Sequence, residues 1–237
     1  MLLAHEPGWP RVVTAGRFLA PPGGYVPGLA REVTCAELAE AVAQVHAAGG
    51  RVAVHAVCPD AVDAAVAAGV DSVEHGWAVS DAHFAAMRAR NVAWVPTLMP
   101  GGSEAACEFA AAMGFSAGTQ EWMREALDAQ PGTVARAHAA GVTVLAGTDA
   151  GQGPHGIIVD QITRLADAGM PVTAAIGAGS WTARRWLGLA CLESGEPADL
   201  VLYGSDPRID LDVLRRPALI VMDGQVIESS PSFAMRD

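Results

Sequence analysis

The chain has 237 residues, 51% of them apolar, and a net charge of −11, so it can bury the core of one barrel-sized domain or of two smaller ones. The negative charge argues against nucleic-acid binding, which needs a cationic surface. All fifteen basic residues are arginine. The absence of lysine excludes a Schiff-base lysine, a P-loop lysine and a carbamylated lysine that bridges two metals.

The sequence predicts a cytoplasmic protein with no membrane span. It contains no uninterrupted run of about 18 apolar residues. The first residues, MLLAHEPGWP, lack a basic segment followed by an apolar core, which a secretory signal needs. The four cysteines form no CxxC pair and are expected to be reduced thiols.

The N-terminal part begins with a short β-like run, Arg11–Thr14, and continues in a loop rich in proline and glycine around Tyr25. Loops of this composition occur at barrel mouths and also as plain linkers. Tyr25 is therefore a candidate substrate contact, with the linker as the alternative. Thr34 and Glu37 then match the capping-box pattern that opens a helix.

A unit of helix, glycine and short apolar strand then repeats along the chain. Strands are expected at Val52–Val54, Val70–Val73, Val92–Val95 and Val142–Ala146. Three of them follow nearly the same phrase, HAAGG, VAAGV or HAAGV. Repeated αβ units favour a parallel α/β fold over an irregular α+β fold.

Helices are expected between these strands and after the last of them, at residues 59–68, 81–90, 119–140, 157–168 and 172–187. Pro131 is expected to break the third of them into two. Residues 100–118 show only a loose helical pattern, which suits a lid over a barrel mouth.

The C-terminal segment changes to antiparallel β-structure. It reads ADLVLY and then PALIVMDGQVI, in which Asp223-Gly224 is a type I′ hairpin signal. We expect a barrel over residues 1–192 and strands of a small β-sandwich over residues 193–237. Five strands are recognisable in the first part, whereas a closed barrel needs eight.

Three polar residues end predicted strands, namely His55, His75 and Asp149. Because barrel active sites lie at the carboxyl ends of the strands, we expect these side chains to converge. Two imidazoles and a carboxylate suit a catalytic zinc or similar divalent ion with an open position for water. The alternative is that each is an ordinary strand-end polar residue. Strand alternation predicts that Glu74 points away from His75 and is structural.

The other histidines fall outside this pattern. His155 lies in the loop after the Asp149 strand and is either a substrate contact or a plain loop histidine. His46, His83 and His138 fall on helix patterns and are expected to be surface or packing residues.

Four segments in order, RVAVHA, GVDSVEHGW, PTL and GVTVLAGTDAG, resemble the second half of metal-dependent amidohydrolases of the imidazolonepropionase and Xaa-Pro dipeptidase type. In the tail, EPADLVLYGSDP and VMDGQVI resemble the closing β-sandwich strands of the same family. The resemblance implies a (β/α)8 TIM-type barrel that hydrolyses C–N bonds of amides, cyclic amides or dipeptides by metal-activated water. It also implies that His55 and His75 bind one metal, and that Asp149 binds the other or acts as general base.

Two features of that family are missing. Its first strand ends in a His-x-His pair and its fourth commonly supplies a carbamylated lysine, but this sequence contains no HxH motif and no lysine. The expected fold is therefore an incomplete barrel that lacks the first strands and the lysine strand. The expected cofactor is one divalent ion, Zn2+ before others, rather than a binuclear centre.

Three functions remain open at this point. The first is a metal-dependent hydrolase that acts on C–N bonds of a small-molecule substrate. The second is a truncated or degenerate, non-catalytic barrel, whose open seam would expose strand edges and favour a homo-oligomer. The third is a deaminase of a heterocyclic amine that uses the same metal chemistry.

Overall fold

The computed structural model describes residues 19–20, 31–32, 34–98, 101–151 and 155–229. The chain packs as two compact units, Thr34–Ser180 and the combination of Met1–Val33 with Trp181–Asp237. The sequence boundary after residue 192 stays a prediction. The expected strand Arg11–Thr14 lies outside the described residues.

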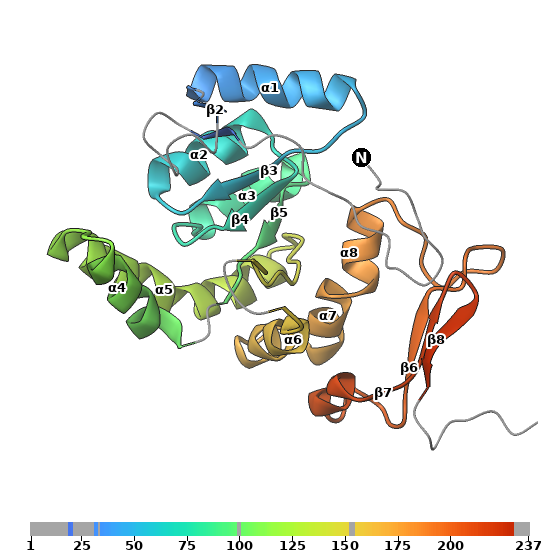
Figure 1. Cartoon of the computed structure of the whole chain (residues 1–237). Coiled ribbons are helices and arrows are strands. Elements are labelled where there is room, and N and C mark those ends of the chain that lie inside the picture. Colours follow the sequence, from blue (N-terminus) through green and yellow to red (C-terminus); the bar gives the residue numbers. More distant parts are fainter. Residues whose placement is uncertain (1–18, 21–30, 33, 99–100, 152–154, 230–237) are drawn as a thin grey trace, which may run out of the picture. The chain divides into compact units, whose positions relative to one another are not determined.

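The unit Thr34–Ser180 is built on a parallel sheet. Its strands, in spatial and chain order, are β3 (Ala53–Ala56), β4 (Ser72–His75) and β5 (Ala93–Val95) (Figure 1). The segment Thr143–Leu145 continues the sheet beside β5. Trp94 N–H donates to Thr143 O at 2.8 Å, and Trp94 O accepts from Leu145 N at 2.9 Å. The strand expected at Val142–Ala146 is thus present as a single parallel bridge between Trp94 and Val144.

Seven helices are described in this unit: α1 (Cys35–Ala47), α2 (Pro59–Ala68), α3 (Asp81–Arg90), α4 (Gly102–Ala112), α5 (Ala117–Ala139), α6 (Ile158–Asp167) and α7 (Val172–Ala178). The predicted capping box opens α1, with Thr34 N–H donating to the Glu37 carboxylate at 2.7 Å. Helix contacts run in sequence from α1 to α2 to α3, then to α5, α6 and α7 (Figure 1). The helices therefore cover the strands as an outer layer, which agrees with repeated αβ units.

The core of this unit lies between the strands and those helices. Its largest fully buried apolar side chains include Trp94, Met87, Leu165, Val62, Val70, Val73 and Val92. Continuous apolar runs of this kind are typical of parallel strands that helices cover. A second cluster joins α4 to α5 through Ala106, Cys107, Ala110, Met123 and Leu127, with Trp77 and Trp122 packed against it.

The prediction that Pro131 breaks its helix is wrong. Residues Ala117–Ala139 form one helix, α5, with Pro131 inside it. A proline in a helix interior costs about 3 kcal/mol in isolation. Tertiary packing outweighs that local preference here, because α5 buries Leu127 and Val134 on either side of the proline and Gln130 directly before it.

The prediction of one helix over residues 172–187 is also wrong. Helix α7 ends at Ala178, and α8 (Trp181–Trp186) begins after Ser180. Gly179 caps α7 and lies so close to Ile162 that an added Cβ would meet its Cδ1 at 2.8 Å. The close approach of α6 at this glycine coincides with the end of α7.

The second unit contains an antiparallel sheet of three strands, ordered β6 (Leu200–Tyr203), β7 (Pro217–Met222) and β8 (Gln225–Ser229). A 3-10 helix, η1 (Leu211–Arg215), precedes β7, and a parallel pair joins β1 (Leu19–Ala20) to β2 (Arg31–Glu32). The predicted hairpin is confirmed, since Asp223 (φ 51°) and Gly224 (φ 78°) both have the positive φ that a type I′ turn requires. A second layer of a β-sandwich stays a prediction.

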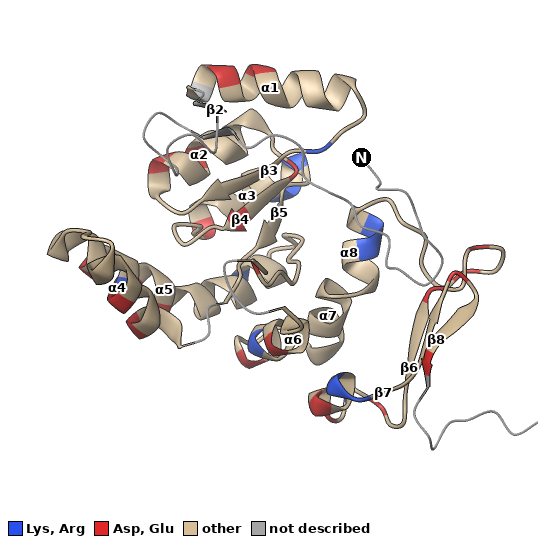
Figure 2. Cartoon of the chain, in the orientation of Figure 1, with Lys and Arg blue, Asp and Glu red and all other residues tan. Residues whose placement is uncertain are grey.

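The charged residues lie mainly on the helices and loops. Figure 2 shows acidic residues on α1, α2 and α4, whereas β3 and β5 contain no Asp, Glu, Lys or Arg. No helix among the residues that the structure describes combines the length and apolar character needed to cross a membrane.

Candidate metal centre at the carboxyl ends of the strands

The carboxyl ends of β3 and β4 bring two imidazoles together. His55 is the third residue of β3 and His75 is the last residue of β4. Their ring centroids lie 4.7 Å apart with an interplanar angle of 68°. The structure therefore pairs the two histidines that the sequence singled out, although their role as ligands stays a prediction.

Regular strand geometry does not explain this contact. The register of β3 and β4 pairs His55 with Glu74, and Ala56 with His75. Because neighbouring residues of a strand point to opposite faces, an ideal strand would place His75 on the face opposite His55. His75 instead has a φ of 61°, and Gly76 N–H donates to Glu74 O at 2.8 Å across it. A tight three-residue turn centred on His75 thus redirects the ring toward His55.

Left-handed residues recur along this edge of the sheet. His75, Thr97 (φ 47°) and Asp149 (φ 50°) follow or end three successive strand positions, β4, β5 and the segment at Val144. For residues other than glycine this conformation costs about 1–2 kcal/mol, and for a β-branched threonine it is a clear outlier. Such strain concentrates at functional sites. The backbone therefore marks the same edge as the histidines do.

Both imidazoles favour their neutral form. Burial lowers the pKa of His55, although the residue as a whole is exposed, and the carboxylate of Asp149 partly opposes this shift. Burial, and then the imidazole of His55, lower the pKa of His75 to about 4, with Asp149 again opposing. A neutral imidazole is the form that binds a metal ion. The same data place Asp149 within electrostatic reach of both rings.

Glu74 also belongs to this cluster. Strand alternation predicted only that it points away from His75 and is structural. It is half-buried and accepts a hydrogen bond from Ser72 Oγ at 2.5 Å. Burial raises the pKa of its carboxyl, the Ser72 bond opposes the shift, and the charge of Asp149 adds to it. Placing Glu74 near the histidines requires the register that pairs it with His55 across β3 and β4. A single sequence does not reveal that register.

The fit to a metal ion is partial. The two neutral imidazoles suit zinc, which binds histidine nitrogen readily. Over residues 34–98, 101–151 and 155–229, however, no group of three or more His, Cys, Asp or Glu side chains is close enough to hold an ion. Asp149, exposed and nearby, does not complete such a group as the side chains stand. The three-residue ligand set therefore stays a prediction.

The remaining candidates are less informative. His155 is exposed in the turn before α6, and its contact with substrate stays a prediction. Tyr25 lies outside the described residues. His46 pairs with Asp71 at 2.8 Å and His83 with Asp63 at 3.0 Å, so these two histidines link neighbouring elements.

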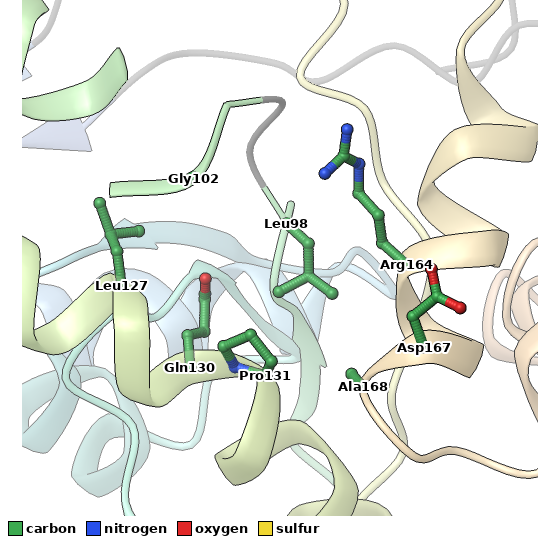
Figure 3. Close-up of a pocket in the computed structure, with 8 residues that line it drawn as sticks. All are labelled: Leu98, Gly102, Leu127, Gln130, Pro131, Arg164, Asp167 and Ala168. Atoms are coloured by element: carbon green, nitrogen blue, oxygen red, sulfur yellow. The ribbon is translucent and has the colours of Figure 1, made fainter. Parts of the chain in front are cut away.

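A pocket of about 270 Å³ lies between α5 and α6 (Figure 3). It is lined by Leu98, Gly102, Leu127, Gln130, Pro131, Arg164, Asp167 and Ala168. None of His55, His75 and Asp149 lines it, so this pocket is separate from the histidine pair. Its relevance to the pair is the shared residue Gln130, which also contacts the strand ends.

Solved structures share this fold. A Xaa-Pro dipeptidase solved with bound methionine matches with a TM-score of 0.70 and 28% identity, over 84% of this chain and 50% of that one. The ochratoxinase of A. niger matches with a TM-score of 0.70 and 21% identity, over 84% of this chain and 46% of that one. This chain spans about half the length of both proteins. The likeness indicates a TIM-barrel-like α/β fold, while closure of the barrel stays a prediction.

Sequence comparison extends the match to most of the chain. A protein of Mycobacterium tuberculosis and one of Mycobacterium bovis, both described as uncharacterised, are 34% identical over 261 residues, which cover 91% of this chain and 69% of theirs. The model of the amidohydrolase family matches residues 22–229, and so takes in both histidines, Asp149 and the C-terminal sheet. The resemblance seen in the strand-end motifs is thus confirmed over nearly the full length, and the chain belongs to the amidohydrolase family.

Proposed function

We propose that this chain carries a metal-dependent hydrolase site for C–N bonds of a small molecule, centred on His55 and His75. The observation that carries the proposal is the 4.7 Å contact between two imidazoles that both favour the neutral form. Two neutral imidazoles side by side can both offer a ring-nitrogen lone pair to one divalent cation.

The residues would divide the work as follows. His55 and His75 would hold one divalent ion, zinc before others, through ring nitrogens. An ion bound there supplies Lewis-acid chemistry and lowers the pKa of water toward neutrality. Asp149, with its exposed carboxylate near both rings, would accept the proton of the attacking water on a carboxylate oxygen. Burial raises the pKa of the neighbouring Glu74 carboxyl, and we assign that side chain no part in the proton transfer.

The class of substrate follows from the related proteins and is part of the proposal. The matched dipeptidase acts on Xaa-Pro dipeptides according to its name. We therefore propose dipeptides and N-acyl amino acids as the first substrates to test, with His155 and Tyr25 as the candidate substrate contacts.

The test measures metal and product in the purified chain. Zinc content is determined after exhaustive dialysis, and hydrolysis is followed with an Xaa-Pro dipeptide, an N-acyl amino acid and an amino-substituted heterocycle. We expect about one zinc per chain and release of an amine from the first two substrates. Release of ammonia from the heterocycle instead would favour a deaminase, and a folded chain that binds no divalent metal would contradict the proposal.

One observation favours the non-catalytic alternative. Among the described strands, β3 pairs on one side only, with β4. An unpaired strand edge is a template for association with another chain. A homo-oligomer without bound zinc, seen by light scattering and metal analysis together, would support the alternative over the hydrolase.

A further inference from the structure

Gln130 connects α5 to the strand ends that carry the candidate metal centre. It is 2% exposed. Its Nε2 donates to His75 O at 2.8 Å and to Pro96 O at 2.9 Å. One amide nitrogen thereby spans the ends of two neighbouring strands, β4 and β5. Figure 3 shows the residue beside Pro131 among the side chains that line the pocket.

The carbonyl of His75 receives a second donor. Trp94 Nε1 donates to the same oxygen at 3.0 Å. An added Cβ on Gly76 would meet that indole nitrogen at 2.5 Å, so the indole packs directly against the turn that follows His75. Two buried donors therefore fix the orientation of the peptide plane between His75 and Gly76, and so hold the turn in which His75 has a φ of 61°.

That conformation is what brings the two rings together. Without the turn, strand alternation would direct His75 away from His55, as the register of β3 and β4 shows. A left-handed residue other than glycine persists only where its surroundings over-determine it. The hydrogen bonds from Gln130 and Trp94 to the His75 carbonyl are such surroundings, and an unpaired buried carbonyl would itself be unfavourable.

We infer that Gln130 is a positioning residue that holds the imidazole of His75 against His55 through the main-chain carbonyl of His75. The inference rests on the proposed function in one respect, the use of the pair as metal ligands. The contact between the rings does not depend on that use. The hydrogen bonds of Gln130 go to the main-chain carbonyls of His75 and Pro96, so Gln130 acts through the backbone.

The chain supplies a matched control in Gln161. This glutamine is also 2% exposed, and its Nε2 also donates to a main-chain carbonyl, that of Leu98, at 2.9 Å. Replacing either glutamine by methionine removes one buried amide of the same length. The two variants therefore share the loss of a buried amide. Gln130→Met loses bonds to two carbonyls and Gln161→Met a bond to one, and only Gln130→Met removes a contact with His75.

The experiment compares Gln130→Met and Gln161→Met in the full chain. Melting temperature reports the shared structural loss, and competition with a chelator reports zinc affinity. In the metal-free protein, NMR nuclear Overhauser contacts report the proximity of the His55 and His75 rings. We expect both variants to melt lower, with only Gln130→Met weakening zinc binding by about 10- to 100-fold, the range for residues that orient metal ligands. Only Gln130→Met should lose the contact between the rings.

Each outcome decides a different point. Equal effects of the two variants on zinc affinity and on the ring contact would overturn the positioning role. If the wild-type chain bound no zinc, the proposed function would be overturned. If, in the same experiments, the ring contact were lost in Gln130→Met and kept in the wild type and in Gln161→Met, the positioning role would still be supported. Should Gln130→Met not fold, Gln130→Asn retains the amide but shortens the side chain by one methylene, and the same loss of ring contact is expected.

Discussion

The two edges of the parallel sheet use the same residue types in opposite ways. At the amino edge, Asp71 precedes β4, accepts from Val52 N at 2.7 Å and pairs with His46 Nε2 at 2.8 Å. Histidine and aspartate are partners there, and the link joins α1 to two strands. At the carboxyl edge, His55 and His75 face each other instead, with Asp149 near both.

Backbone geometry separates the two edges as well. At the amino edge the left-handed residue that is not glycine is Asn91, the C-cap of α3, where asparagine is well tolerated. At the carboxyl edge the left-handed positions are occupied by histidine, threonine and aspartate, of which the β-branched threonine is a clear outlier. The amino edge thus links helices to strands, whereas the carboxyl edge turns His75 toward His55 against the direction that strand alternation favours.

The largest difference between the two edges is expected when one histidine of each is replaced by alanine. His75→Ala removes one candidate ligand and should lower zinc affinity by more than about 100-fold, because removal of a ligand exceeds the effect of a residue that only orients one. His46→Ala removes a histidine of the amino edge and should leave zinc affinity unchanged. Zinc bound per chain after dialysis against a weak chelator measures both. Full zinc occupancy in His75→Ala would contradict the assignment of the carboxyl edge.

The second prediction concerns the metal-free protein in acid. The pKa of His75 is about 4 in the folded chain, against 6.5 when the side chain is unperturbed. Between these values the unfolded chain binds the additional proton, so the free energy of unfolding falls as the pH decreases from about 6.5 to about 4. His75→Gln has no titrating ring and should show a shallower decrease over this window. Chemical denaturation at several pH values measures the slope, and parallel curves for the two proteins would contradict the prediction.

The sequence predicted the edge but not the arrangement on it. Helix, glycine, apolar strand and polar terminus are local signals, so most of the helices, four strand positions and the candidates His55, His75 and Asp149 could be predicted from the residues. The continuity of α5 and the division of residues 172–187 into α7 and α8 could not. The turn at His75 could not, because its φ is imposed by Gln130 and Trp94, which lie 55 and 19 residues away in the chain. The contribution of Glu74 required the register between β3 and β4, which is also non-local.

Pro131 illustrates the same limit from the opposite direction. Its local signal is strong and correct for an isolated helix, yet the chain continues as α5. In the turn before the proline, Leu127 packs in the cluster that joins α5 to α4, and Gln130 bonds α5 to the strand ends. The local pattern therefore fails where long-range contacts hold the helix, and one of these contacts also supports the candidate site.

The third prediction addresses the amino edge directly. Asp71→Ala leaves the Val52 N–H and His46 without their partner and should lower the free energy of unfolding by about 1–3 kcal/mol. Asp63→Ala breaks the other histidine pair, in which the Asp63 side chain is 71% exposed, and should cost less than about 1 kcal/mol. Urea denaturation gives both values. Neither variant should alter zinc affinity, and a tenfold loss in Asp71→Ala would mean that the two edges are not independent.

The smallest effect is expected from relieving one left-handed residue on each edge. Asn91→Gly removes the side chain from a helix C-cap and should raise the free energy of unfolding by less than about 1 kcal/mol, with zinc affinity unchanged. Thr97→Gly relieves the corresponding strain after β5, but it loosens the backbone next to Pro96, whose carbonyl shares the amide of Gln130 with His75. We therefore expect Thr97→Gly to weaken zinc binding by a few-fold, measured by the same chelator competition. If both glycine variants left zinc affinity unchanged, the left-handed conformation of Thr97 would not contribute to zinc binding, as we expect for Asn91. Of the left-handed residues tested, none would then support the metal centre, and that role would be limited to the turn at His75.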